Sequence, residues 1–177
     1  MFVARYDISG GAEWVMGLGG TGRDYSYAAI ADSSDNVVLV GYFQEQVDFG
    51  GTILTSAGGY DGFVAKFDDA GSLLWVTAFG ASGDDFAKFA AVGSNDSVWV
   101  AGEVFLDTAS AGQDVFVSKY TSSGSFEWVL TFGASGDETV TGLADSGDGG
   151  VLVTGEFRDS ITIQGTTLTS VGSDDVY

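Results

Sequence analysis

Short apolar runs recur along this chain and are separated by clusters of glycine, aspartate, asparagine and serine. In the middle of the chain the runs are "FVAKFD" (63–68), "LLWVTAF" (73–79), "FAKFAAV" (86–92) and "SVWVAGEVF" (97–105). Short runs bounded by residues that tolerate turn conformations predict β-strands joined by hairpins. Because no stretch shows a sustained helical period with caps, the pattern predicts an all-β protein.

The predicted strands are apolar on both faces. Alternate positions of "LLWVTAF" place Trp75 and Phe79 on one face. Leu74 and Val76 lie on the other face. An antiparallel sheet with one solvated face would alternate apolar with polar residues instead. We therefore expect each sheet to have a neighbouring sheet on both sides, as blades do around a propeller axis.

The runs are organised as three repeats within a single domain, residues 1–177. In every unit the step from an opening Phe to a Trp is 12 residues, and the step from that Trp to the Gly of a "VxVxG" pattern is 27 residues. The units are residues 2–62, 63–115 and 116–176. Fixed spacing over three copies predicts one four-stranded antiparallel blade per repeat, so about three blade equivalents per chain.

The third interval of the repeat varies by eight residues. Gly41 to Phe63 is 22 residues and Gly102 to Phe116 is 14 residues. We interpret the difference as a longer loop in the first and third units, over residues 44–61 and 158–174.

The position of the repeat within the chain predicts split blades. Two complete blades are expected over residues 25–79 and 86–132, with the strand after the acidic loop innermost and the Trp strand outermost. Residues 2–18 would supply two outer strands, and residues 139–157 two inner strands. Two copies joined head to tail would complete six blades and leave no open sheet edge. The alternative partner is the set of missing blades of a longer chain.

A glycine-rich acidic loop is written three times, as "LGGTGRD" (18–24), "FGASGDD" (79–85) and "FGASGDE" (132–138). Its acids can accept backbone N–H bonds within the turn, which is a purely structural role. The functional alternative is an acidic rim that binds Ca²⁺ through carboxylate oxygens. The candidates are Asp24, Asp85 and Glu138, joined on the same face by Asp61, Asp114 and Asp174.

Residues 63–104 and the segment "GTILTSAGGYDGFVAKFD" (51–68) resemble the bacterial β-propeller repeats known as SBBP repeats. The resemblance covers all three units. It implies a propeller blade found in secreted or cell-surface bacterial proteins, with no general catalytic activity. Arg23 departs from the pattern, since the other two units have Asp84 and Asp137 at its position.

Composition narrows the function further. The chain has no His and no Cys, which removes Ser-His and Cys-His nucleophile pairs and thiolate metal sites. Its formal charge of −19 disfavours nucleic acid and anionic membrane surfaces. No apolar run is long enough to span a bilayer, and residues 1–20 show no signal peptide.

These observations favour a non-enzymatic scaffold or interaction module with an unidentified protein or glycan partner, outside the cell or at its surface. Calcium or carbohydrate binding by the acidic loop face is the alternative, and no firm cofactor is expected. We expect the repeated aromatic residues to form the core of the blades rather than sugar-stacking platforms. They are Trp14, Trp75, Trp128, Phe63 and Phe116.

Overall fold

A computed structural model describes residues 1–105, 112–134, 136–172 and 175–176. It confirms the all-β prediction, because the described residues form sixteen strands and no helix. Accordingly, the described part of the chain contains no helix that is long and apolar enough to cross a membrane. The strands are β1 (Phe2–Tyr6), β2 (Ala12–Gly17), β3 (Gly19–Gly20), β4 (Tyr25–Ala31), β5 (Val37–Asp48), β6 (Ile53–Phe67), β7 (Leu73–Phe79), β8 (Phe86–Val92), β9 (Val98–Val104), β10 (Asp114–Tyr120), β11 (Phe126–Phe132), β12 (Thr139–Asp145), β13 (Val151–Phe157), β14 (Ser160–Ile163), β15 (Thr166–Thr169) and β16 (Asp175–Val176).

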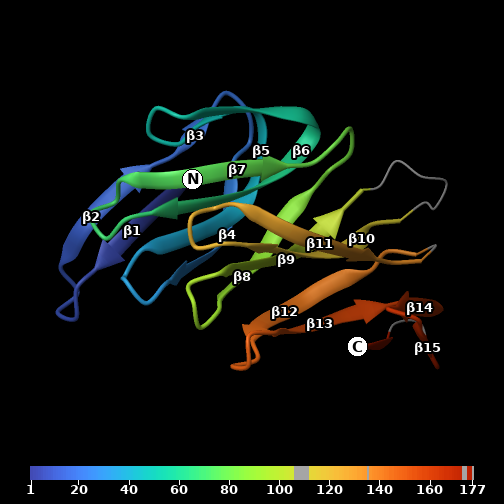
Figure 1. Ribbon diagram of the computed structural model, residues 1–177. Coiled ribbons are helices and arrows are strands. Elements are labelled where there is room, and N and C mark those ends of the chain that lie inside the picture. Colours follow the sequence, from blue (N-terminus) through green and yellow to red (C-terminus); the bar gives the residue numbers. More distant parts are fainter. Residues whose placement is uncertain (106–111, 135, 173–174, 177) are drawn as a thin grey trace.

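Two complete antiparallel sheets form the centre of the molecule (Figure 1). The first contains β4, β5, β6 and β7 in that order, with the short β3 added beside β5. The second contains β8, β9, β10 and β11. These are the strand groups expected for residues 25–79 and 86–132. In both sheets the Trp-bearing strand, β7 or β11, is an edge strand.

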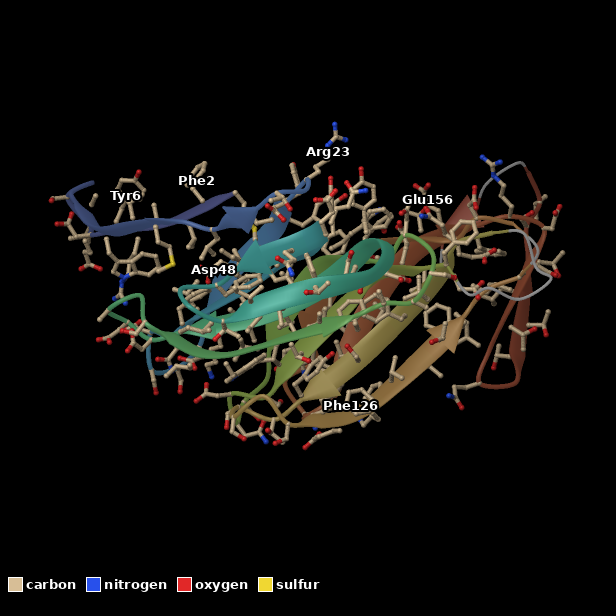
Figure 2. The ribbon with its side chains drawn as sticks, turned by 90° about the horizontal axis from the view of Figure 1, so that it is seen from above. Phe2, Tyr6, Arg23, Asp48, Phe126 and Glu156 are labelled. Carbon is tan, nitrogen blue, oxygen red and sulfur yellow. The ribbon has the colours of Figure 1, made fainter. Side chains whose placement is uncertain are left out.

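Incomplete sheets flank the two complete ones. The β1–β2 hairpin lies at one end of the molecule and the β12–β13 pair at the other (Figures 1 and 2). Strand β16 pairs with β13 only at Glu156 and Phe157. The described residues show no closed ring of sheets, so the propeller itself remains a prediction.

Three apolar clusters fill the spaces between successive sheets. The first joins the β1–β2 hairpin to β5 and β6 through Val3, Leu39 and Phe63. The second joins the two complete sheets through Val38, Val100 and other residues of both. The third joins β9, β10 and β11 to β12, β13 and β14. The two central strands of each complete sheet are therefore packed on both faces, as the two-faced apolar pattern predicted, whereas Tyr25 and Tyr27 on β4 and Trp128 on β11 are partly exposed.

The variable segment differs from the loop that we expected. In the first unit it extends the β5–β6 hairpin to Asp48 and Ile53, with Glu45 at φ 62° where the register shifts. In the third unit it forms the β14–β15 hairpin. These segments form strands because two strands already in register can continue their backbone hydrogen bonds beyond the edge of the sheet. In the second, shorter unit this segment includes residues 106–111, which lie outside the described residues.

One ion pair is buried between the two complete sheets. Lys66 Nζ lies 2.6 Å from Asp32 Oδ2, and both side chains are almost fully buried. Lys66 also donates to the Ser122 carbonyl, so it links the first sheet to a turn of the second. Burial by itself raises the pKa of Asp32, but Lys66 and hydrogen bonds from Asn36 and Ser34 outweigh it and lower that pKa to about 2.

Replacing Lys66 by Met should lower the free energy of unfolding by about 3–5 kcal/mol, because the Asp32 carboxylate would stay buried without its partner. Urea unfolding at pH 7 measures this effect. The depressed pKa of Asp32 also means that its stabilising contribution is present above about pH 4 and is lost as pH falls towards 2.

Lys119→Met is the matched control for Lys66→Met, because Lys119 holds the same repeat position but pairs with the more exposed Glu127. We expect it to cost less than about 1 kcal/mol. Equal losses in the two variants would contradict a special role for the buried pair.

Candidate functional site

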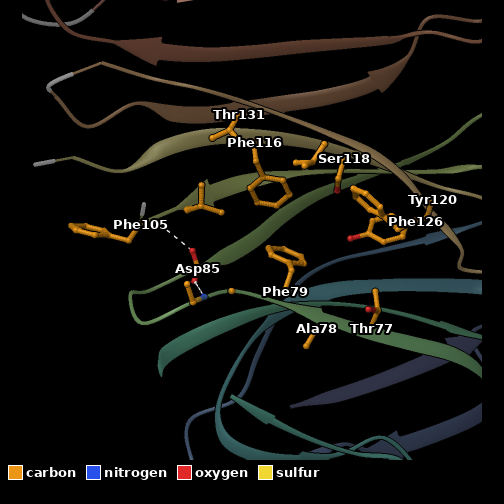
Figure 3. A pocket seen from close by; sticks show the side chains of 14 residues that line it. Thr77, Ala78, Phe79, Asp85, Phe105, Phe116, Ser118, Tyr120, Phe126 and Thr131 are labelled. Atoms are coloured by element: carbon orange, nitrogen blue, oxygen red, sulfur yellow. Dashed lines mark hydrogen bonds between the residues drawn. The ribbon is translucent and has the colours of Figure 1, made fainter. Parts of the chain in front are cut away.

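The acidic loop of the second unit is a hub of backbone hydrogen bonds. Asp85 Oδ2 accepts from Ala81 N at 2.9 Å, and Asp85 Oδ1 accepts from Phe105 N at 3.1 Å (Figure 3). Asp84 Oδ1 accepts from Tyr60 N at 3.0 Å. The loop therefore ties the end of β7 to β6 and β9. These bonds are the structural role predicted for the acids of this loop, which is to accept hydrogen bonds from backbone N–H groups.

The same loop position gathers acids in pairs. A Cβ atom on Gly80 would lie 2.7 Å from Asp61 Cγ and 2.8 Å from Asp85 Oδ2, so both carboxyl groups reach this glycine. In the next unit Asp114 and Glu138 meet in the same way at Gly133.

All four paired acids are buried, and burial raises the pKa of each carboxyl group. The Asp61 charge raises the pKa of Asp85 further, and the Asp114 charge does the same for Glu138. One oxygen of each pair, Asp61 Oδ1 or Glu138 Oε1, has no hydrogen-bond partner.

The structure does not bring the three predicted acids together. Asp24 accepts from Gly20 N within its own loop, while Asp85 and Glu138 each pair with a different acid. Within the described ranges no group of three or more acids is placed to hold a metal ion. Asp174 lies outside the described residues, and the position equivalent to Asp61 and Asp114 is Asp175 on β16.

Asp61→Asn should raise the free energy of unfolding at pH 8 by roughly 1 kcal/mol, since its amide can donate to Asp85 where two carboxylates now meet. The raised pKa values of Asp61 and Asp85 mean that the folded state holds protons more tightly. Stability of the unmodified chain should therefore increase as pH falls from 8 towards 5, and this slope should be shallower in the variant. Denaturant unfolding across this pH range measures both effects.

Asp69→Asn, in an exposed turn, controls for the loss of one negative charge from an acidic protein. If it flattens the pH dependence as much as Asp61→Asn does, the effect comes from net charge and not from the buried pair.

The repeated Phe residues are buried in the complete sheets and exposed at the end of the molecule. Phe63 is 0% exposed and Phe116 2%, whereas Phe2, at the same repeat position, is 71% exposed. A Cβ atom on Gly41 would lie 2.9 Å from the Phe63 ring, so the phenyl group covers the glycine of the neighbouring strand. Phe2 has no such strand beside it, because among the described residues β1 pairs only with β2. Figure 2 shows Phe2 projecting away from the neighbouring ribbon.

The repeated Trp residues join each sheet to the next. Trp14 packs on Gly71 and donates to Asp69 O, and Trp75 packs on Gly124 and donates to Ser122 O. Both indoles are half-buried.

Trp128 departs from the expected core position, since it is 40% exposed. The physical reason is that no described turn lies where Gly71 and Gly124 receive the other two indoles. Gly10, in the β1–β2 turn, is the third glycine of the series with Gly71 and Gly124, and no indole covers it: a Cβ atom on Gly10 would have nothing within 4 Å.

Apolar grooves lie beside both incomplete sheets. One, of 250 Å³, lies between β1 and β4 and includes Phe2, Tyr6 and Tyr27. The other, of 270 Å³, lies between β11 and β13 and includes Trp128 and Val153. A larger cavity of 410 Å³ separates β7 from β10 and β11 and is lined by Phe79, Phe116 and Phe126 among others (Figure 3).

The repeat spacing does not predict that Phe2, Tyr6 and Gly10 lie at the surface. Their repeat equivalents were visible in the spacing, but exposure depends on which neighbouring sheet is missing.

The chain is similar to two much longer proteins. An uncharacterized WD repeat-containing protein of Acanthamoeba polyphaga mimivirus is 23% identical over 201 aligned positions, which cover 91% of this chain. The regulatory protein FlaEY of Caulobacter vibrioides is 31% identical over 153 positions, which cover 80% of it. The alignments span only 14% and 15% of these relatives. No protein-family model matches the chain. WD repeats form β-propellers, so the similarity supports a repeat protein of propeller type.

Proposed function

We propose that this chain is a non-enzymatic propeller scaffold that binds its partner by completing the sheets at its two ends. The observation that carries the proposal is the contrast between equivalent residues: Phe63 and Phe116 are buried, while Phe2 is 71% exposed on β1, which among the described residues pairs only with β2. Unpaired edges with apolar faces favour strand addition, because main-chain hydrogen bonds and side-chain burial act together.

We propose head-to-tail assembly of two copies into a six-bladed ring. Each copy supplies two complete sheets, and its two half-sheets complement each other: by repeat position β1–β2 correspond to the third and fourth strands of a complete sheet, and β12–β13 to the first and second. A two-fold arrangement uses both open ends at once, whereas an assembly that did not close would grow into filaments. The resemblance to SBBP repeats supports a place outside the cell or at its surface.

A closed dimer predicts a discrete solution mass. Light scattering coupled to size exclusion should give twice 18.3 kDa, which is 36.6 kDa, independent of loading above the dissociation constant. A stable 18.3 kDa species at all concentrations would refute self-assembly and assign the open edges to the blades of a longer chain. A broad distribution of masses would indicate open-ended association instead of a ring.

A second candidate function is calcium or carbohydrate binding by the acidic loop face. It is favoured by the two acid pairs, each of which has a carboxylate oxygen without a hydrogen-bond partner. Ca²⁺ normally takes six to eight oxygen ligands, so a pair would need backbone carbonyls and waters in addition.

Thermal unfolding with and without about 5 mM CaCl₂ separates the two functions, since a ligand of the folded state raises Tm by mass action. For a scaffold alone we expect the two Tm values to agree, because a ligand that does not bind the folded state adds nothing to its stability. A rise in Tm that MgCl₂ does not reproduce and that Asp114→Asn abolishes would establish the calcium site.

A further inference from the structure

Resting on the proposed head-to-tail assembly, we infer the register of its interface: β1 of one copy pairs antiparallel with β13 of the other, with Phe2 opposite Gly155, Ala4 opposite Val153 and Tyr6 opposite Val151. The occupant of the groove between β1 and β4 is therefore the β12–β13 pair of a second copy of this chain.

Both complete sheets supply this register. The third strand pairs with the second so that Phe63 faces Gly41 and Phe116 faces Gly102. Gly155 is the equivalent glycine on β13, and Phe2 is the equivalent phenylalanine on β1. Strand β16 pairs with β13 only at Glu156 and Phe157, so the β13 edge from Val151 to Gly155 has no partner among the described residues. The same register places Met1 of the second copy opposite Glu156, so β1 would displace Val176 of β16 from that position.

The side chains on the two edges fit this pairing. Tyr6 is 62% exposed, while its equivalents Phe67 and Tyr120 are 1% and 4% exposed. In the second sheet Phe116 packs edge-to-face on Phe79 at 4.8 Å, and Tyr120 stacks on Trp75 at 6.3 Å between ring centroids. The same contacts across the dimer would place Phe2 on Phe132, and Tyr6 on Trp128, of the second copy.

The inner strands show the complementary exposure. Leu152 on β13 is 60% exposed, whereas Val38 and Trp99, its equivalents on β5 and β9, are 0% and 3% exposed. Their strands lie against the first strands of the following sheets, β8 and β12, and Val38 shares an apolar cluster with Ala87 of β8. In the dimer Leu152 would be covered by β4 of the second copy, where Tyr25 and Tyr27 are 50% and 43% exposed.

The indole contact supplies an independent constraint from a different element. Trp14 covers Gly71 and Trp75 covers Gly124, so each sheet's outer strand caps the turn of the next sheet. Continuing the series, Trp128 would cover Gly10 in the β1–β2 turn of the second copy and donate to the Ile8 carbonyl. Gly10 keeps the positive φ of the other two glycines, at 83° against 85° for both. The turn is therefore already shaped to receive the ring.

Disulfide trapping tests the register, because the native chain has no cysteine. A chain carrying Ala4→Cys is mixed with one carrying Val153→Cys in a glutathione redox buffer, and the linked heterodimer is quantified on non-reducing gels. Directly opposed residues have Cα atoms about 4.5–5.5 Å apart, within disulfide range. The matched control replaces Val153→Cys by Leu152→Cys, whose side chain points to the opposite face of the strand. We expect linkage to Val153→Cys to be about tenfold faster or more.

If light scattering shows a dimer but Ala4→Cys links equally fast to Val153→Cys and Leu152→Cys, or faster to Leu152→Cys, the register is wrong while the proposed assembly still holds. A monomer that forms no linked species would overturn both.

A second measurement avoids cysteine: Phe2→Ala should raise the dimer dissociation constant about tenfold or more through lost burial. Leu74→Ala, an exposed apolar residue on the outer strand of a complete sheet, should not change it. Because Phe2 is 71% exposed in the single chain, the variant and the unmodified chain should have the same Tm when both are measured below the dissociation constant, where both are monomeric.

Discussion

The structure depends on covering both faces of every sheet. The strands are apolar on both sides, so a sheet left alone would expose one hydrophobic layer whichever way it turned. The three apolar clusters meet this requirement between successive sheets. At the two ends of the molecule the described residues do not meet it. The exposed Phe2, Tyr6 and Leu152 are the consequence.

Glycine and aromatic residues make the stacking of sheets repeatable. A phenyl ring covers a glycine of the adjacent strand, at Phe63 with Gly41 and at Phe116 with Gly102. An indole covers a turn glycine of the next sheet. A side chain at any of these glycines would overlap the ring or the nearby backbone. The fixed spacing of the repeat therefore places an aromatic ring over a glycine wherever the neighbouring strand or turn is present. The proposed interface uses this arrangement without any new kind of contact.

Charge acts against assembly and shapes how it must be achieved. Two copies of a chain of formal charge −19 repel each other, and only six Lys and Arg residues are available to offset the repulsion. Association must therefore rest on backbone pairing and apolar burial. Inside the sheets the same shortage of cations leaves acids paired with acids at Gly80 and Gly133, while Lys66 neutralises the buried Asp32 and Lys88 the buried Glu103.

The sequence by itself determined the strands, their grouping into sheets and the equivalence of Phe2 with Phe63 and Phe116, because periodicity and fixed spacing are local properties of the chain. It could not determine that the variable segment extends the β5–β6 hairpin, since strand pairing there depends on register beyond the sheet. Nor could it place Asp85 beside Asp61 or leave Trp128 exposed. Carboxyl groups that are distant in sequence meet only when the loops are folded, and an indole is buried only when a neighbouring turn covers it.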